Sequence, residues 1–254
     1  MSLLRYYADL ARDSGYSVAK GLALPLVRRE AVRSRTHTTI YPTLTYSPWR
    51  GDDAFQRTWK TIRKNTLVDE FRCWELWSLL SELRDVPGAV IEIGVWRGGS
   101  GALMAERCRQ LGIDDPVYLC DTWEGIVKTT AEDPYYHDGK HDDTSKQIVE
   151  QLVARMGLTD RVRLLKGIFP DDTAHLVDED ATFRLVHIDV DVYQGAKDVF
   201  DYAWPRLSPG GFVVFDDYGC AATPGVTKFV EEQRGMDDRV VIHNANGHAL
   251  VFRR

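Results

Sequence analysis

Acidic residues stand at the ends of two apolar segments of this sequence. The segment FRLVHID ends at Asp189 and is followed by Asp191, and GFVVFD ends at Asp216 and is followed by Asp217. Such segments are typical of buried parallel strands, and open parallel sheets bind ligands at the carboxyl ends of their strands. We therefore expect Asp189, Asp216 and Asp217 to converge. Carboxylates that lie together repel one another unless a cation lies between them, and oxygen ligands favour Mg²⁺. The alternative for Asp217 is a helix N-cap.

A glycine-rich turn follows a third apolar segment, AVIEI, at residues 89–93. The sequence continues GVWRGGS and then becomes an apolar stretch over 102–108 that predicts a helix. Strand, glycine turn and helix open a nucleotide-binding βαβ unit, in which glycine allows close approach of the backbone and the helix N–H groups face the ligand. The spacing differs from the dinucleotide pattern G-x-G-x-x-G, which counts against NAD. A structural glycine turn without a ligand is the alternative.

The turn resembles motif I (E/D-x-G-x-x-x-G) of class I S-adenosylmethionine-dependent methyltransferases. In that family the turn holds the methionine part of the cofactor, and an acid at the end of the second strand binds the ribose. Asp121 at the end of VYLCD matches that acid, although an acid there also suits an NAD enzyme. By this resemblance the expected cofactor contacts are Glu92, Gly94, Val95, Trp96, Gly99, Ser100, Asp121, Thr122, Trp123, Gly125, Gly167, Ile168, Phe169 and Asp189.

Four motifs together resemble the macrocin O-methyltransferase family over about residues 58–254: EIGVWRGGS, DTWEG, HIDVDVY and LSPGGFVVFDDY. The resemblance implies S-adenosylmethionine- and Mg²⁺-dependent methylation of a sugar hydroxyl on a natural product, with a deoxysugar such as rhamnose as the expected acceptor. It implies that residues 59–65 close over the cofactor and that Asp191 is the general base. The implied metal ligands are Asp189, Asp216 and Asp217. The family motif more often reads R-M-D-G-D-x-Y, so Val190 and Val192 are expected to reshape the acceptor site.

A polar stretch of about twenty residues, 126–145, is too long for a simple connection. We expect it to be a lid or acceptor-binding loop, the alternative being a solvated loop. Its histidines, His141 and His137, are the rival candidates for the catalytic base because histidine titrates near neutral pH. Asp191 is favoured because a residue at a strand end is better positioned than one on a mobile loop.

The order of the expected elements predicts an α/β fold: a single doubly wound Rossmann-like methyltransferase sheet closed by an antiparallel hairpin. Residues 1–66 are expected to form a helical and irregular extension, a lid or an oligomer contact, and residues 67–254 the methyltransferase domain. Trp49, Phe55 and Trp59 are expected to help close the pocket. SPGG at 208–211 predicts a turn. Helices are expected over 1–20, 67–85, 100–111, 146–157, 193–204 and 223–232, and strands over 89–93, 117–121, 162–165, 183–189, 211–216, 240–243 and 248–252.

The composition narrows the class of protein further. The chain has 254 residues, 44% of them hydrophobic, and a formal net charge of −6, which argues against nucleic acid as a partner. No apolar run reaches the roughly 20 residues of a membrane span, and no signal peptide is recognised. The four cysteines form no C-x-x-C pair. These features predict a cytoplasmic protein, and the family resemblance implies a small-molecule glycoside as its acceptor. The basic cluster Arg28, Arg29, Arg33 and Arg35 is expected to be a solvated surface, the alternatives being a homo-oligomer contact or a wall of the acceptor site.

Four other functions remain open at this point. A catechol-type Mg²⁺-dependent O-methyltransferase and a cephalosporin-hydroxylase-like protein share the implied fold and acids. An NAD-dependent oxidoreductase is the third, and the absence of the G-x-G-x-x-G pattern counts against it. A non-catalytic binding module on the same scaffold would not need the acids at the strand ends.

Overall fold

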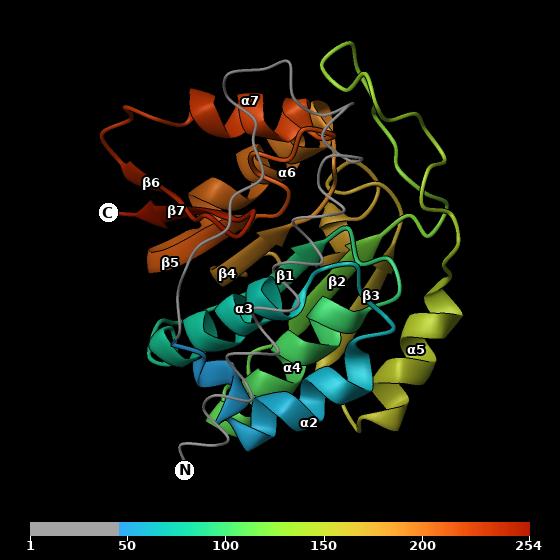
Figure 1. The fold of residues 1–254 in the computed structure, drawn as a ribbon, viewed down its shortest axis with the longest axis vertical. Helices are drawn as coiled ribbons and strands as arrows, with labels where there is room; N and C mark the ends of the chain where they lie inside the picture. The colour runs from blue at the N-terminus through green and yellow to red at the C-terminus, as the bar shows by residue number, and fades with distance from the viewer. Residues whose placement is uncertain (1–45) are drawn as a thin grey trace, which may run out of the picture. The chain divides into compact units, whose positions relative to one another are not determined.

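A seven-stranded sheet forms the centre of the computed structural model, which describes residues 46–254 (Figure 1). Its strand order is β3-β2-β1-β4-β5-β7-β6. The first five strands in the chain pair in parallel, whereas β7 pairs antiparallel with both β5 and β6. The predicted doubly wound sheet with a final hairpin is therefore confirmed. The strands are β1 (Ala89–Ile93), β2 (Val117–Asp121), β3 (Val162–Lys166), β4 (Phe183–Ile188), β5 (Leu207–Phe215), β6 (Arg239–His243) and β7 (Ala249–Arg253).

Helices cover both faces of this sheet. The buried side chains of α2, α3, α4 and α5 share one hydrophobic cluster, and those of α6 and α7 share the other. Neighbouring strand residues alternate between them, so Val90 packs in the first cluster and Ile91 in the second. The helices are α2 (Asp53–Ile62), α3 (Glu70–Glu82), α4 (Gly99–Leu111), α5 (Lys146–Arg155), α6 (Tyr193–Ala203) and α7 (Pro224–Glu232). Among the described residues, no helix is long and apolar enough to cross a membrane.

The three aromatic residues that precede α3 pack against the hydrophobic core and are not among the residues that line the cavity at the carboxyl ends of the strands. Phe55 is fully buried, and its ring lies 5.1 Å from that of Trp74 and 5.7 Å from that of Trp77, measured between centroids. Trp49 and Trp59 pack against the same cluster. Residues 46–66 therefore belong to the same compact unit as the rest of the described chain. The predicted helix over 1–20 and the arginine cluster lie outside the described residues.

The SPGG sequence forms part of β5 instead of the predicted turn. β5 begins at Leu207, opposite Phe183 of β4, but Leu185 already faces Phe212. The extra residues of β5 are taken up by a bulge, which explains why glycine and proline occur inside a strand. Beyond the bulge the register is regular to Phe215, so both strands end at the same edge of the sheet.

Candidate active site

A cavity opens at the carboxyl ends of β1, β2, β4 and β5, where the strand order reverses. It encloses about 1210 Å³ of empty space, counted out to its open mouth and including solvent there. The position is the one at which open α/β sheets bind ligands. The predicted site residues that line it are Gly94, Val95, Trp96, Ser100, Asp121, Thr122, Gly125, His141, Gly167, Ile168, Phe169, Asp189, Asp191, Asp216 and Asp217.

The glycine turn brings the ends of β1 and β4 into contact. Gly94 has a φ of +89°, and a Cβ atom built on it would lie 1.7 Å from the carbonyl oxygen of Asp189. Asp121 holds the turn from the next strand, because its carboxylate accepts hydrogen bonds from the backbone N–H groups of Val95 (2.7 Å), Trp96 (2.8 Å) and Trp123 (2.6 Å). Burial raises the pKa of Asp121, and these hydrogen bonds oppose the rise. The carboxylate thus organises the floor of the cavity; ribose binding by Asp121 stays a prediction.

Three residues expected to contact the cofactor do not line the cavity. Glu92 is fully buried and its Oε1 lies 2.9 Å from Nδ1 of His187. Strand residues alternate in direction, so Glu92 points into the layer beneath α3 while Ile93 reaches the cavity. Gly99 donates its N–H to a backbone carbonyl at 2.8 Å, and the indole of Trp123 donates to the carbonyl of Trp96 at 3.1 Å. These three residues make contacts within the protein next to the glycine turn and do not face the cavity.

Three aspartates come together on one wall of the cavity: Asp189, Asp191 and Asp217. Each offers a carboxylate oxygen, and these oxygens all lie within 4.8 Å of one another. Burial and the neighbouring negative charges raise the pKa of each of them. Asp191 and Asp217 also take left-handed backbone conformations, with φ of 63° and 59°, a strain that is typical of functional sites.

These three carboxylates fit a hard divalent cation. A cation between them would remove the mutual repulsion and favour the charged carboxylates, and Mg²⁺ prefers oxygen ligands of this kind. The hydroxyl of Tyr136 hydrogen-bonds to Asp191, and Asp191 is hydrogen-bonded to Asp217. Two of the three predicted metal ligands, Asp189 and Asp217, therefore lie close together. Asp191, the predicted base, lies beside them.

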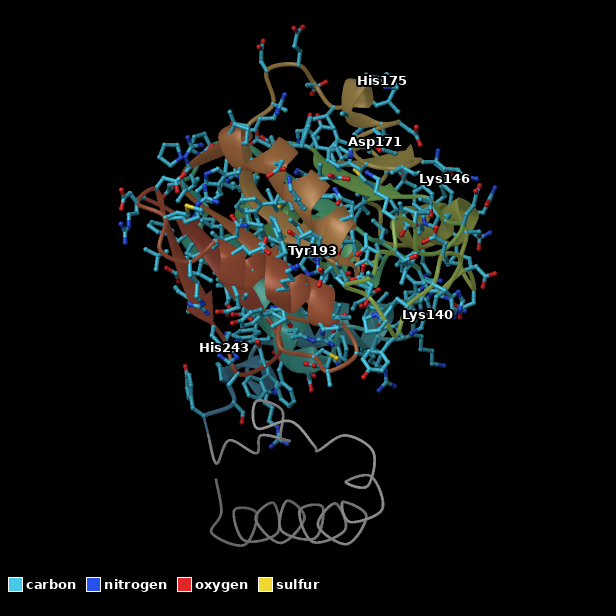
Figure 2. All side chains as sticks on the ribbon, turned by 90° about the horizontal axis from the view of Figure 1, so that it is seen from above. Lys140, Lys146, Asp171, His175, Tyr193 and His243 are labelled. Atoms are coloured by element: carbon cyan, nitrogen blue, oxygen red, sulfur yellow. The ribbon has the colours of Figure 1, made fainter. Side chains whose placement is uncertain are left out.

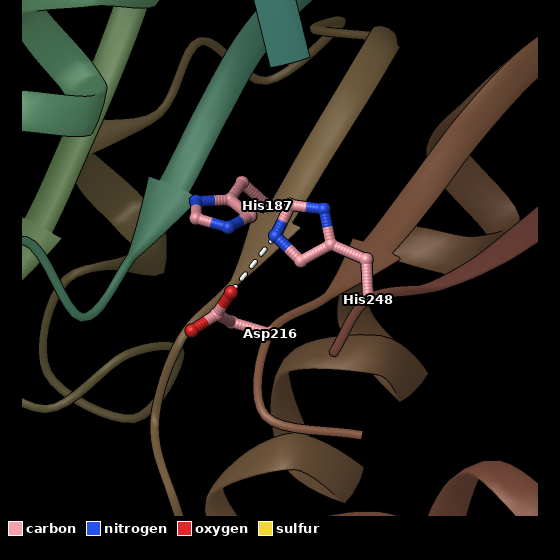
Figure 3. Close-up of side chains that lie close together, drawn as sticks. All are labelled: His187, Asp216 and His248. Atoms are coloured by element: carbon pink, nitrogen blue, oxygen red, sulfur yellow. Dashed lines mark ion pairs between the residues drawn. The ribbon is translucent and has the colours of Figure 1, made fainter. Parts of the chain in front are cut away.

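Asp216 faces away from this cluster. Its Oδ2 lies 2.5 Å from Nη1 of Arg72, and its Oδ1 lies 2.8 Å from Nε2 of His248 (Figure 3). The charge of Arg72 and the approach of His248 lower the pKa of Asp216 despite its burial. Nη1 of Arg72 lies between the two acids, 2.5 Å from Asp216 and 3.5 Å from Asp217, and metal binding by Asp216 stays a prediction. Asp216 becomes a ligand of the same ion only if Arg72 leaves its Oδ2.

Several lining residues were missed by sequence reasoning. Thr66, Leu67 and Val68 form the wall ahead of α3, directly after the stretch 59–65 expected to close over the cofactor. Arg72 pairs with Asp216 and also lies 3.5 Å from Asp217. Arg72 lies between Phe71 and Cys73 in an amphipathic helix, and nothing in that pattern marks it as the counter-ion of acids some 140 residues away.

The polar stretch 126–145 forms one wall of the cavity and is tied down at both ends. Lys128 lies 2.8 Å from Asp171 and 2.6 Å from Asp198 of α6. At the other end Asp143 pairs with Arg97 of the glycine turn at 2.8 Å. Figure 2 labels Lys140 of this stretch together with Asp171 and Tyr193 of the segments that it contacts. The stretch therefore borders the cavity, and its function as a lid or acceptor-binding loop stays a prediction.

The two histidines of this stretch differ in position. His141 lines the cavity, whereas His137 is exposed and its Nδ1 lies 3.0 Å from the carbonyl oxygen of Asp138. Burial and the charge of Lys140 lower the pKa of His141, so it is neutral at neutral pH and chemically able to accept a proton. His141 therefore remains the rival of Asp191.

Buried Asp133 joins this stretch to the start of α6. Its Oδ1 accepts the N–H of Tyr193 at 2.9 Å, and its Oδ2 accepts the N–H of Thr130 at 3.0 Å. The N-cap residue of α6, Val192, makes no side-chain cap, so Asp133 takes over that function from a distant loop.

We expect Asp133→Ala to lower the free energy of unfolding by about 1 kcal/mol, the usual value of a lost N-cap, and to speed proteolysis within 126–145. Thermal denaturation and limited proteolysis measure the two effects. Asp138→Ala is the matched control, because exposed Asp138 accepts the N–H and hydroxyl of Thr129 as Asp133 accepts those of Thr130, but Asp138 has no bond to α6. Equal behaviour of the two variants would contradict the anchoring function.

Comparison with known proteins connects this geometry to a family. Residues 59–253 match the model of the macrocin-O-methyltransferase (TylF) family. The mycinamicin III 3''-O-methyltransferase of Micromonospora griseorubida is 35% identical over 177 residues, which cover 63% of this chain and 67% of that protein. The 8-demethyl-8-(2,3-dimethoxy-alpha-L-rhamnosyl)-tetracenomycin-C 4'-O-methyltransferase of Streptomyces olivaceus is 32% identical over 164 residues, 61% of this chain and 62% of that protein. The chain thus matches about two thirds or less of the length of these relatives.

Solved structures share the fold. The O-methyltransferase NovP superposes with a TM-score of 0.66 at 26% identity, covering 75% of this chain and 82% of that chain. The calicheamicin methyltransferase CalS11 gives a TM-score of 0.62 at 18% identity, covering 85% of this chain and 98% of that chain. The second likeness concerns the fold alone.

Proposed function

Because the chain belongs to the macrocin O-methyltransferase family, we propose that it transfers the methyl group of S-adenosylmethionine to a hydroxyl of a sugar, with Mg²⁺ as a second cofactor. The acceptor is proposed to be a deoxysugar, such as rhamnose, carried by a small natural product. The names of two relatives support this choice, since one acts on a rhamnosyl-tetracenomycin and the other on mycinamicin III.

One observation carries the proposal: the glycine turn and the three-aspartate cluster open into the same cavity. The methyl group of a sulfonium is already activated, so the protein has to present a nucleophilic oxygen in line with it at close distance. A cofactor on the turn and a hydroxyl at the aspartates would be neighbours. A structural glycine turn would not need acids beside it.

Each residue of the cluster has a proposed part in this reaction. Asp189 and Asp217 would hold Mg²⁺, which when bound lowers the pKa of a hydroxyl that it coordinates. Asp191 would take the proton of the acceptor hydroxyl. The hydroxyl of Tyr136, which lowers the pKa of Asp191, would hold its carboxylate in place.

The first test is calorimetric titration of the purified protein with S-adenosylhomocysteine, with NAD as the control ligand. We expect micromolar binding of S-adenosylhomocysteine and no binding of NAD, because the turn lacks the dinucleotide spacing. Binding of NAD instead would overturn the proposed cofactor, and with it the proposed reaction.

The acceptor class is tested next by comparing deoxysugar glycosides with catechols in a methyl-transfer assay, with and without a chelator. The proposal requires turnover of a glycoside and its loss on chelation. Activity on catechols alone would reassign the protein to the phenolic O-methyltransferases while leaving its fold and cofactor unchanged.

A further inference from the structure

The polar stretch 126–145 contributes two aromatic rings to the cavity wall, those of Tyr136 and His141. Both side chains are half-buried, and their ring centroids lie 6.1 Å apart with an angle of 47° between the ring planes. Tyr135, the neighbour of Tyr136 in the chain, is 65% exposed and does not line the cavity. The fold of the stretch therefore places one of two consecutive tyrosines at the cavity and the other in solvent.

The backbone of the stretch holds Tyr136 in place. The N–H groups of Ile126 and Gly139 donate hydrogen bonds of 2.8 Å to the carbonyl oxygens of Lys140 and Ile126, respectively, which closes the stretch into a loop. Within that loop the N–H of Tyr136 donates to the carbonyl oxygen of Asp133 at 3.1 Å. Asp133 is itself buried and fixed to the start of α6. An ordered backbone of this kind allows a side chain to serve as a preformed binding surface.

One face of the Tyr136 ring is covered by a cation. Nζ of Lys140 lies 3.6 Å from the ring centroid, the position of a cation–π contact. Lys140 does not line the cavity, so the face that its ammonium group covers is turned away from the cavity. The opposite face of the ring is therefore the one that an occupant of the cavity meets.

Tyr136 also lies on the acidic side of the cavity. Its hydroxyl is hydrogen-bonded to Asp191. The strands β4 and β5, which precede the aspartates, lie on one side of β1 in the sheet, whereas β2 and β3 lie on the other. Asp121 and Phe169, which are expected to contact the cofactor, come at the end of β2 and after β3. The ring therefore belongs to the half of the cavity in which a methyl acceptor would bind.

Two other aromatic residues of the cavity have partners of their own. The indole N–H of Trp96 donates to Oδ1 of Asp143 at 2.9 Å. The ring of Phe169 packs edge-on against that of Tyr202, with 4.9 Å between the centroids. Among the aromatic residues that line the cavity in the described part of the chain, Tyr136 is thus the one that is hydrogen-bonded to the aspartate cluster.

We propose that Tyr136 is the platform on which the acceptor sugar lies, with an apolar face of the sugar on the ring and the reacting hydroxyl directed to Asp191. This inference rests on the proposed function and names the part of the cavity that holds its acceptor. The C–H groups on a sugar face carry a small positive charge, and the face of an aromatic ring is negative, so the two attract each other. A deoxysugar has fewer hydroxyls and offers a larger apolar face, which favours this contact.

The ring and the hydroxyl of Tyr136 then have separable functions, because the ring binds the sugar and the hydroxyl holds the carboxylate of Asp191. Tyr136→Phe keeps the ring and is expected to lower kcat while the KM for the acceptor changes by less than about threefold. Tyr136→Leu removes both groups and is expected also to raise the KM by at least about fivefold. Tyr135→Leu is the matched control, with the kinetics of the wild-type protein.

Saturation-transfer NMR measures acceptor binding separately from turnover. The full chain, saturated with S-adenosylhomocysteine and Mg²⁺, is titrated with methyl α-L-rhamnopyranoside while the aromatic protons of the protein are irradiated. We expect transfer to the ring C–H protons of the glycoside. Wild-type protein, Tyr136→Phe and Tyr135→Leu are expected to bind it with similar affinity, and Tyr136→Leu at least about fivefold more weakly. Calorimetry with S-adenosylhomocysteine, unchanged in all four proteins, shows that the cofactor site is intact.

Equal affinity of Tyr136→Leu and wild-type protein for the glycoside would overturn the platform and leave the proposed function intact. An equal loss of affinity in Tyr136→Phe would assign the binding to the hydroxyl and not to the ring. Weaker binding of S-adenosylhomocysteine by Tyr136→Leu would also contradict the inference, since the residue would then shape the whole cavity. No transfer from the wild-type protein to the glycoside would refute the proposed acceptor class, and this inference with it. The wild-type result thus distinguishes the two failures.

Discussion

Replacing Asp191 with asparagine is expected to lower the rate of methyl transfer by at least about 10²-fold while S-adenosylhomocysteine binding is unchanged. Asparagine has the size of aspartate and can still hydrogen-bond to Asp217 and Tyr136, but it cannot accept the proton of an acceptor hydroxyl. The kcat at saturating acceptor, measured beside the calorimetric affinity for S-adenosylhomocysteine, separates the loss of a base from the loss of a binding site.

The matched control for this variant is His141→Gln, which removes the rival base from the same cavity. We expect a much smaller decrease in kcat for His141→Gln, because His141 is not among the three clustered carboxylates. A near-normal rate for Asp191→Asn together with an inactive His141→Gln would transfer the proton-accepting function to the histidine. Loss of Mg²⁺ binding in Asp191→Asn would instead make Asp191 a metal ligand.

Replacing Gly94 with alanine is expected to abolish binding of S-adenosylhomocysteine. The added Cβ would lie 1.7 Å from the carbonyl oxygen of Asp189, and a backbone atom at a strand end cannot move aside as a flexible side chain can. The clash pushes β1 from β4 at the point where the turn meets the aspartates. Calorimetry with S-adenosylhomocysteine measures the loss, and circular dichroism shows whether the sheet still forms.

Gly112→Ala separates the clash from backbone strain. Gly112 has a φ of +69°, comparable to that of Gly94, but nothing lies within 4 Å of its Cβ position. Alanine there should cost about 1 kcal/mol of stability, through the left-handed conformation alone, and leave the cofactor affinity intact. Equal cofactor affinity in the two variants would show that the contact between Gly94 and Asp189 does not shape the site.

Features that depend on neighbouring residues could be predicted from the sequence. The apolar segments, the glycine turn and the hairpin are each encoded in neighbouring residues, and the strands and helices between 67 and 254 lie within a few residues of their expected bounds. Glu92 shows the limit of such reasoning. Its place in the motif pointed to the cofactor, but the alternation of β1 turns it toward His187 instead.

Contacts between distant segments could not be predicted from the sequence. Asp216 and Asp217 look equivalent in FDDY, yet Asp216 pairs with His248 and Asp217 joins Asp191, while Arg72 contacts both. That choice depends on α3 and on the residue before β7, which lie far away in the chain. The aromatic residues before α3 are misread for the same reason, since their partners are contributed by another helix.

Arg72 has a consequence for how the molecule responds to ligands. It lies 3.5 Å from Asp217, so its guanidinium would compete with the proposed divalent ion for the same carboxylate. Arg72 belongs to α3, and the three residues 66–68 just ahead of that helix form part of the cavity wall. A ligand that moved residues 66–68 together with α3 would also move the guanidinium of Arg72. Binding of that ligand and binding of the ion would then be coupled reciprocally. An occupant of the cavity that draws Arg72 away raises the affinity for the ion, and the ion raises the affinity for that occupant by the same factor.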